Sequence, residues 1–216
     1  ILRDGGFDQI YIQPAAGDAG GALGAALVGY HLQLGQARRV NGDAMQGAYL
    51  GPAFTQAEIE ARLNSCGARF ELLEDTALIE TCAQDLAQGK ALAWFQGRME
   101  FGPRSLGNRS ILGDPRSPTM QKTLNLKVKY RESFRPFAPS VLRERVSDWF
   151  EMDCDSPYML LVADVVKSRR REMTAAEKQL FGIDKLNVPR SDIPAVTHVD
   201  YSARIHFVNV GEPWRS

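Results

Sequence analysis

Residues 97–118, with the sequence GRMEFGPRSLGNRSILGDPRSP, are the feature that most constrains this chain. The stretch contains four arginines, four glycines and three prolines. Glycine and proline at this density favour a fixed loop over a helix or a strand. Arginine side chains stay charged and match the geometry of phosphate and carboxylate. The stretch therefore predicts an anion-binding loop, in which Gly102 and Gly107 let the backbone approach a ligand and offer N–H donors.

Positive charge gathers around this loop. Between Arg98 and Arg135 there are nine Lys or Arg against three acids, a window of +6 in a chain whose formal net charge is zero. This concentration indicates an anionic partner, which is a nucleotide, a small phosphate or a nucleic acid. A solvated basic face is the alternative, but the glycine and proline context favours binding. No GxxxxGKS or GxGxxG motif is present, so neither a P-loop nor a Rossmann site is predicted.

The remaining composition predicts a soluble, cytoplasmic, globular protein with no membrane partner. A chain of 216 residues can bury a core, and no apolar run approaches the length of a spanning helix. No segment has the pattern of a signal peptide. Cys66, Cys82 and Cys154 lack CxxC spacing, which favours buried thiols over a disulfide or a zinc site.

Hydrophobic periodicity and helix-boundary residues predict an irregular alternation of helices and strands, which favours an α/β or α+β fold with a mixed sheet. The charged segment from Lys167 to about Arg190, including the KSRRR run, is predicted to be a solvated loop. The predicted strands are 10–12, 91–95 (buried), 158–166 and a last one near 195–208, and the predicted helices are 20–34, one starting after Thr55, 75–88, one starting at Pro118, and 143–150.

The segment AAGDAGGALGAA raises a second possibility. Asp18 lies in a glycine-rich turn before a helix, a place where a phosphate binds and a carboxylate can reach a metal ion. An ordinary N-cap is the alternative. The glycines inside this helix each cost stability, so a tightly packed neighbour is expected to press on it.

Taken together, GRMEFGPRSLGNRSILGDPR, YRESFRPFAPSVL, SPYML, VTHVDYSARI and QPAAGDAGGALGAAL resemble the NodU/CmcH family of O-carbamoyltransferases over nearly the whole chain. The resemblance implies that residues 1–36 are the end of an actin-like (ASKHA) domain and 37–54 a linker. It implies that 55–216 form a YrdC-like domain with a mixed, twisted sheet and flanking helices. That domain would form carbamoyl adenylate from carbamoyl phosphate and ATP, and the ASKHA domain would pass the carbamoyl group to a hydroxyl of a small acceptor.

The same resemblance implies roles for individual residues. Asp18 matches a ligand of a divalent metal, iron or magnesium, and Gly20 and Gly21 match the turn beside the nucleotide. Residues matching the basic groups that hold carbamoyl phosphate and the ATP phosphates are Arg104, Lys129, Arg135 and Arg204. The first three are also the expected catalytic residues, which would place positive charge where the phosphoryl oxygens develop negative charge. Arg109 and Ser110 share the motif without an assigned role.

Two departures from the family pattern bear on this interpretation. The expected histidine pair of the ASKHA domain is absent, and His31, His198 and His206 do not have its spacing, so they are interpreted as structural. The family's NTSFN-type segment is also missing before the chain ends in FVNVGEPWRS. The chain is therefore expected to be a fragment that binds its ligands without complete turnover.

Two alternatives to the enzyme remain. One is a non-catalytic RNA-binding module of YrdC type, whose binding would weaken steeply with salt. The other is a structural docking domain whose arginines pair with acids of a missing ASKHA partner. Nucleic acid is the less favoured partner of those considered.

Overall fold

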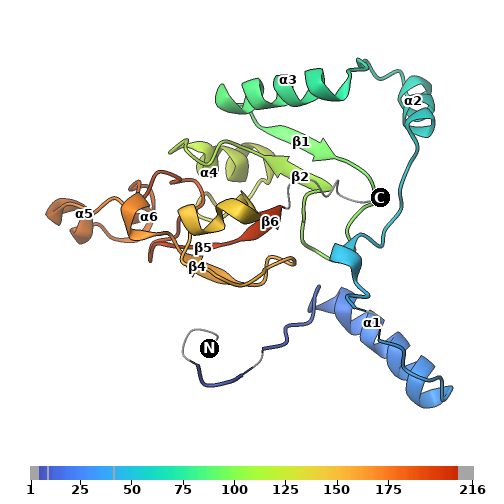
Figure 1. Cartoon of the computed structure of the whole chain (residues 1–216). Coiled ribbons are helices and arrows are strands. Elements are labelled where there is room, and N and C mark those ends of the chain that lie inside the picture. Colours follow the sequence, from blue (N-terminus) through green and yellow to red (C-terminus); the bar gives the residue numbers. More distant parts are fainter. Residues whose placement is uncertain (1–4, 9, 41, 209–216) are drawn as a thin grey trace.

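The computed structural model describes residues 5–8, 10–40 and 42–208. Its helices and short strands alternate irregularly along the chain, which confirms the predicted α/β class (Figure 1). The α-helices are α1 (Asp18–Val28), α2 (Gln56–Ser65), α3 (Asp75–Ala87), α4 (Met120–Thr123), α5 (Ala175–Gln179) and α6 (Gly182–Leu186). Wider π-turns continue α1 and α4 over Gly29–Gln33 and Leu124–Val128, and 3₁₀ turns cover Gln46–Ala48, Arg143–Asp148 and Lys167–Arg169.

The described strands pair in three two-stranded ladders. β1 (Leu92–Phe95) and β2 (Arg109–Leu112) are antiparallel, as are β4 (Val162–Asp164) and β5 (Ser202–Arg204). The third ladder is parallel and joins β3 (Ser140–Leu142) to β6 (His206–Val208). Because β5 and β6 are separated only by Ile205, the last two ladders follow one another on a single extended segment.

The main core lies around these two consecutive ladders. Ala203 and Ile205 are fully buried in it, so the alternation of an extended chain turns Ser202, Arg204 and His206 toward the other side. The polar side of residues 202–206 is therefore fixed by the burial of its apolar side. The other buried residues of this core are Val141, Val146, Phe150, Ala163, Val165, Ile193 and Val196.

Local sequence signals predict several helix ends well. Thr55 and Glu58 form the expected reciprocal capping box at the start of α2. Helix α3 ends at Ala87, directly before the predicted stop at Gly89, and it lies along β1 in Figure 1. The helix expected after Pro118 begins at Met120.

Three sequence predictions of local structure are wrong. Residues 10–12 are extended but form no strand, because no partner strand lies beside them in the part of the chain described. The strand at 91–95 forms but is not buried, since it pairs only with β2 and leaves the Phe95 side chain 50% exposed. The segment 167–190 is not a plain loop, because it contains α5 and α6.

The cysteine prediction is also wrong. All three thiols are free, as expected, but Cys66 is exposed and Cys82 and Cys154 are only half-buried. Cys66 follows α2, a helix without a buried residue, and its sulfur donates only to the nearby carbonyl of Leu63 among the described residues, at 3.2 Å. Among the described residues, no helix has both the length and the hydrophobicity to cross a membrane.

Residues 43–52, expected to be a linker, lie against the arginine loop. The N–H of Phe101 donates to the carbonyl of Ala48 at 2.6 Å, and the N–H of Gly51 donates to the carbonyl of Met99 at 2.9 Å. Ala48 is buried in a small cluster with Leu106. The division of the chain at residues 36 and 54 stays a prediction, but this segment is positioned by packing rather than free.

Candidate anion site

The arginine-rich stretch connects β1 to β2, and one buried carboxylate fixes its conformation. Glu100 is 4% exposed, and its Oε1 accepts N–H bonds from Leu106, Asn108 and Arg109 at 2.7, 2.9 and 3.2 Å. Its Oε2 lies 3.5 Å from the Nε of Arg109. A carboxylate that accepts several N–H bonds and faces a guanidinium can remain charged while buried. Glu100 therefore fixes the backbone of residues 106–109 from the buried side of the loop.

Two further side chains hold the same loop through the carbonyl of Leu106. The Tyr49 hydroxyl donates to it at 3.0 Å, and the His206 Nε2 lies 3.0 Å from it. Burial and the negative charge of Glu100 both raise the pKa of Tyr49, so its hydroxyl stays a donor. Burial lowers the pKa of His206, which favours the neutral ring. Side chains from two distant segments thus converge on one loop residue.

This arrangement corrects the predicted role of the loop backbone. The N–H groups of residues 106, 108 and 109 are used by Glu100, and that of Gly107 faces the Ser110 hydroxyl at 3.2 Å. Gly102 has φ +99°, and a Cβ there would lie 2.6 Å from the Cβ of Ala15. Glycine at 102 therefore allows the loop to approach residues 14–18 rather than a ligand. The N–H groups of residues 106–109 are therefore not offered to an anion.

Arg109 and Ser110, which the resemblance left without a role, take part in this internal network. Arg109 donates from NH2 to the Gly102 carbonyl at 3.1 Å, in addition to facing Glu100. Both residues begin β2. Their contacts assign them to shaping the loop.

A second basic loop, residues 131–135, is held by a buried amide. Asn125 is fully buried and donates from its side chain to the carbonyls of Ser133 and Arg135 at 3.0 and 2.8 Å. Its Oδ1 accepts from the Nε of Arg131 at 2.6 Å. The Arg131 guanidinium also lies over the ring of Phe137, 5.0 Å from its centroid. Asn125 and Phe137 therefore orient the Arg131 side chain.

Arg204 belongs to the polar side of residues 202–206, which faces these loops. The Arg204 side chain is half-buried, and its Nε is inaccessible to solvent without a hydrogen-bond partner among the described residues. Two residues further on, on the same side of the extended chain, His206 touches Leu106 of the arginine loop. Arg204 therefore lies beside the loop that carries Arg104.

The positive charges of Arg104 and Arg131 lie near the Arg204 guanidinium and repel it. The pKa of Arg204 is lowered first by burial and then by the positive charges of Arg104 and Arg131. Arginine remains protonated at neutral pH even when its pKa falls, so the repulsion persists. In the part of the chain described, no hydrogen bond or ion pair engages the Arg104 side chain. A bound anion would offset this repulsion.

The predicted set is thus brought together only in part. Arg104 and Arg204 converge, and Arg131 joins them. Lys129 is exposed after the π-turn of residues 124–128, and Arg135 forms a surface ion pair with Glu132 at 3.0 Å, its side chain 55% exposed. No contact places Lys129 or Arg135 with the three arginines, so their roles stay predictions.

The residues predicted at the first helix have simpler surroundings. Asp18 begins α1 with an exposed side chain, and the N–H of Gly20 donates to the carbonyl of Ala15. A Cβ at Gly20 would lie 2.6 Å from that oxygen, so close backbone packing requires glycine there, while Gly21 is open. Among the described residues, no group of three His, Cys, Asp or Glu could hold a metal ion. The described residues therefore do not by themselves form a metal site around Asp18.

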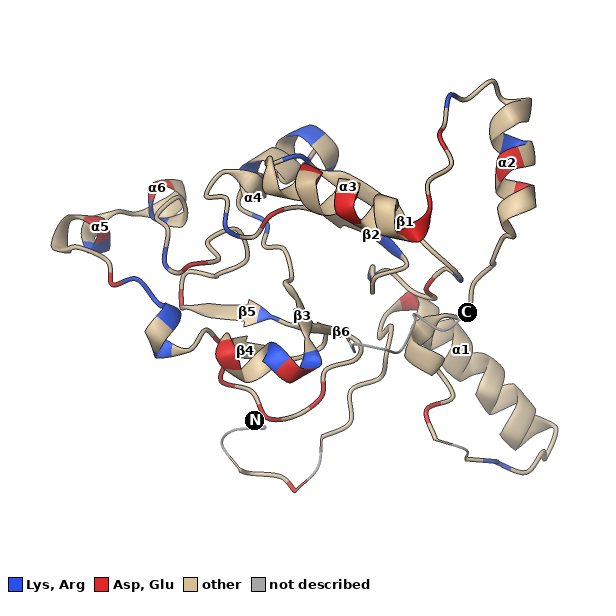
Figure 2. Cartoon of the chain, turned by 45° about the horizontal axis from the view of Figure 1, so that its top comes forward, with Lys and Arg blue, Asp and Glu red and all other residues tan. Residues whose placement is uncertain are grey.

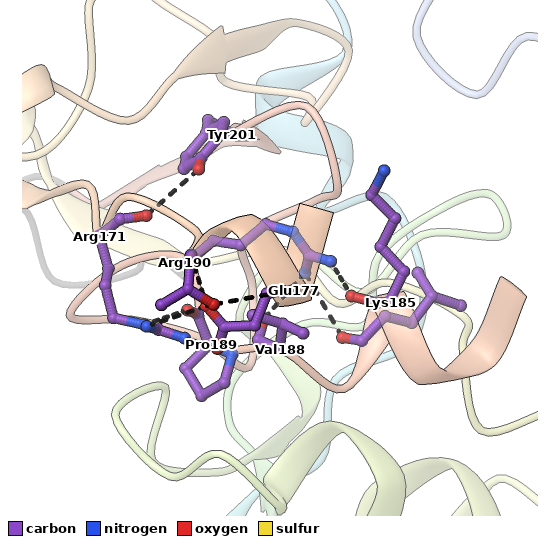
Figure 3. Close-up of polar contacts among 9 residues, drawn as sticks. Arg171, Glu177, Lys185, Val188, Pro189, Arg190 and Tyr201 are labelled. Carbon is purple, nitrogen blue, oxygen red and sulfur yellow. Dashed lines mark hydrogen bonds and ion pairs between the residues drawn. The ribbon is translucent and has the colours of Figure 1, made fainter. Parts of the chain in front are cut away.

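A second arginine-rich region, residues 167–190, is structural. Arg190 is 3% exposed and donates to the carbonyls of Lys185, Leu186 and Val188 at the end of α6 (Figure 3). Arg171 donates to the carbonyl of Pro189 at 2.7 Å and pairs with Glu177 at 2.5 Å.

The other two arginines of the KSRRR run are engaged in a similar way. Arg169 stacks on Trp149 with 4.3 Å to the ring centroid, and Arg170 donates to the carbonyl of Val165 at 2.6 Å. The predicted solvated loop is therefore wrong. These guanidinium groups attach the two ends of the segment carrying α5 and α6 to each other and to neighbouring residues.

Reasoning from sequence missed the three residues that organise the site. Glu100 counted only as an acid in a basic window, and Asn125 lay in an unremarkable helix. A carboxylate inside a run of glycines and arginines was the available clue, because backbone N–H groups turned inward by such a loop need an acceptor. Nothing in the sequence distinguished Arg131 from its basic neighbours.

Comparison with known proteins matches the segments that carry the candidate site. The family model "Carbamoyltransferase C-terminus" matches residues 83–213, which include the loops holding Arg104 and Arg131 and also Arg204. An uncharacterized protein of Synechocystis is 58% identical over 97% of this chain, which corresponds to 34% of that protein. The nodulation protein NolNO of Sinorhizobium fredii is 41% identical over 97% of this chain and 28% of its own length.

More distant relatives keep the same coverage. Nodulation protein U of Rhizobium fredii is 31% identical over 97% of this chain and 30% of its own length. The chain thus spans about a third of the length of the curated relatives it matches. Because the family model covers most of the chain, including every basic residue of the candidate site, the chain belongs to the family of carbamoyltransferase C-terminal domains.

Proposed function

We propose that this chain is the part of an O-carbamoyltransferase that binds carbamoyl phosphate and, with ATP, forms carbamoyl adenylate. A larger protein would then transfer the carbamoyl group to a hydroxyl of a small acceptor. Family membership supports carbamoyl transfer in general. The observation that carries the assignment to this site is the convergence of Arg104, Arg131 and Arg204, with a buried Nε on Arg204 that has no protein partner among the described residues.

The chemistry proposed for these arginines is binding and charge compensation. A phosphoryl group has several oxygens that accept N–H bonds and carries close to two negative charges near neutral pH. Three nearby guanidinium groups, of which Arg131 is oriented by Asn125 and Phe137, would bind it and would favour the negative charge that develops as the phosphate leaves. Glu100 and Asn125 would hold the two loops that carry Arg104 and Arg131.

ATP and a divalent metal belong to the proposal through the resemblance alone. Asp18 would be one ligand of such a metal, and Gly20 and Gly21 would lie beside the nucleotide. Because the described residues do not form a metal site, no step is assigned to that metal. Lys129 and Arg135 are proposed as contacts of the ATP phosphates, which would reach the exposed loop around 129–135.

The distribution of charge favours a small anion over RNA. Lys and Arg are interspersed with Asp and Glu over the described ribbon (Figure 2). Many arginines outside the cluster are already paired, at Asp114–Arg116, Glu132–Arg135, Arg143–Asp155, Arg145–Asp148, Arg169–Asp192, Arg170–Glu151 and Arg171–Glu177. Binding of a nucleic-acid backbone depends on a continuous basic face.

Calorimetric titration with carbamoyl phosphate tests the proposal. We expect Arg104→Ala and Arg204→Ala each to weaken binding by about ten-fold or more, because each removes charged hydrogen bonds to the phosphate. Lys178→Ala, at an exposed lysine of α5, is the matched control and should leave binding unchanged. Binding that is indifferent to both arginines would overturn the site. Tight, salt-sensitive RNA binding would favour the nucleic-acid alternative, and no binding of either kind would favour a docking domain.

A further inference from the structure

A hydrogen-bonded relay of three side chains lies next to Arg204. Asp200 Oδ1 accepts from both the hydroxyl and the backbone N–H of Ser202, at 2.7 and 3.1 Å. The Ser202 Oγ in turn lies 3.0 Å from the Nδ1 of His198. The turn that brings them together is closed by the N–H of His198, which donates to the carbonyl of Ser202 at 2.8 Å. Carboxylate, hydroxyl and imidazole therefore form one chain.

The relay determines which ring nitrogen of His198 carries the proton. A serine hydroxyl has a single hydrogen, and here Asp200 accepts it. The Ser202 oxygen can then only accept from His198, so Nδ1 is the protonated nitrogen and Nε2 carries a lone pair. Burial and the neighbouring charge of Arg204 lower the pKa of His198, which is consistent with a neutral ring.

The Nε2 of His198 is buried without a partner. It is inaccessible to solvent and has no hydrogen-bond partner among the described residues. The same is true of the Nε of Arg204. Ser202, which touches the His198 ring, and Arg204 are two residues apart on β5, so both side chains lie on the side of the strand turned away from the core. One side of β5 thus holds a buried acceptor and a buried donor, neither of them satisfied.

We propose that His198 determines specificity by accepting a hydrogen bond from the amino group of carbamoyl phosphate through its Nε2. The inference rests on the proposed function, since it assumes that the phosphate lies at Arg104, Arg131 and Arg204. In that position the ligand's phosphoryl and carbonyl oxygens are acceptors that match the guanidinium donors. The amino group is the one donor of the ligand, and the His198 Nε2 is a buried acceptor whose ring contacts Ser202, two residues before Arg204 on β5.

This assignment explains how the site would distinguish carbamoyl phosphate from acetyl phosphate. The two molecules have the same phosphate and nearly the same shape, but acetyl phosphate has a methyl group in place of the amino group. With acetyl phosphate bound, the His198 lone pair would remain buried and unsatisfied, which costs affinity. We expect a preference for carbamoyl phosphate of about ten-fold, the usual effect of one such unmade hydrogen bond.

Calorimetry with inorganic phosphate, carbamoyl phosphate and acetyl phosphate tests the inference. His198→Phe keeps a planar ring but removes the acceptor, and we expect it to abolish the preference while phosphate affinity is kept. His198→Gln retains an acceptor oxygen and should keep part of the preference. Ser202→Ala frees the His198 ring and should reduce the preference less. The ratio of the two acyl phosphate affinities separates a ligand contact from a purely structural role, which would weaken all three ligands equally.

A spectroscopic measurement on the unmodified chain covers the case in which a variant fails to fold. The ¹⁵N resonance of the His198 Nε2 should shift when carbamoyl phosphate binds and not when acetyl phosphate binds. An unchanged resonance, or a preference that survives His198→Phe, would overturn the role of His198 and leave the phosphate site intact. No binding of any phosphate would overturn the proposed function itself, and this inference with it.

Discussion

Two arginine-rich regions of this chain differ in what holds their backbone. In the loop of residues 97–109, the buried carboxylate of Glu100 holds the backbone with help from Arg109, and the Arg104 side chain has no hydrogen bond or ion pair among the described residues. In the segment 167–190, the arginines themselves hold the backbone, since Arg190 and Arg171 donate to carbonyls of residues 185–189. The number of arginines therefore does not identify a binding site. An arginine is available to a ligand where another side chain organises its loop.

Removing the Glu100 carboxylate should give the largest decrease in the free energy of unfolding. Glu100→Ala leaves three N–H groups without an acceptor and Arg109 without its counter-charge. We expect the free energy of unfolding to fall by about 3–5 kcal/mol, measured by urea denaturation. Glu100→Gln keeps one acceptor oxygen and should lose less. Glu144→Ala, at an exposed acid, is the control, and an equal small loss from both alanine variants would contradict the role of Glu100.

Removing Arg190 should destabilise the chain less. Arg190→Met fills a similar volume but leaves the carbonyls of Lys185, Leu186 and Val188 without this donor. Lys185 and Leu186 are only partly buried, so their carbonyls can be partly hydrated, and we expect a loss of about 2–3 kcal/mol by the same method. Phosphate affinity should not change. A large loss of phosphate affinity on Arg190→Met would place Arg190 in the anion site and contradict the structural role of the arginines in the segment 167–190.

Replacement of arginine by lysine sharpens the contrast. Lysine keeps the charge but loses the planar, multiple donors of arginine. Arg104→Lys should weaken phosphate binding by about five-fold and leave the unfolding midpoint unchanged, because Arg104 binds no described protein group. Arg171→Lys should do the reverse, since the Arg171 fork contacts both Glu177 and Pro189. Titration calorimetry and thermal unfolding of the two variants measure both properties, and similar behaviour of the pair would contradict the division.

The sequence predicted the parts of this molecule that depend on local interactions. The capping box at Thr55, the end of α3 near Gly89 and the α/β class follow from neighbouring residues. The anion-binding role of residues 97–118 was predicted from their own composition and stays a prediction. The contacts that organise it were not predictable, because Tyr49 and His206 come from segments 57 and 100 residues away from Leu106.

The same limit explains the incorrect predictions. The KSRRR run has the composition of a solvated loop, but its partners, Trp149 and Pro189 among them, lie about twenty residues away on either side. Lys129 and Arg135 have the same charge as Arg131, yet only Arg131 is oriented by Asn125 and Phe137. Which basic side chains of a loop turn inward depends on buried groups beneath the loop.

The smallest predicted effect is a pH dependence of stability in the segment 167–190, where Glu177 is bound by Thr174 and Arg171; these three residues are called the clasp. Glu58 and Glu177 both close capping boxes with a threonine, but only Glu177 also pairs with an arginine, Arg171. The hydrogen bond from Arg171, followed by those of Thr174, lowers the pKa of Glu177 to about 2. The hydrogen bonds of Thr55 lower the pKa of Glu58. An unfolded glutamate titrates near pH ~4.3. The clasp therefore stabilises the fold fully above that pH, and its contribution is lost as the pH falls toward 2.

Carboxyl NMR titration of both residues in one sample measures this difference. Glu177 should titrate at a lower pH than Glu58, and Arg171→Ala should raise the midpoint of Glu177 toward that of Glu58 while the midpoint of Glu58 stays fixed. Because both carboxylates are at the surface, salt should reduce the difference. Equal midpoints at low salt would mean that Arg171 does not hold Glu177, and the second region would then lack the clasp that separates it from the anion loop.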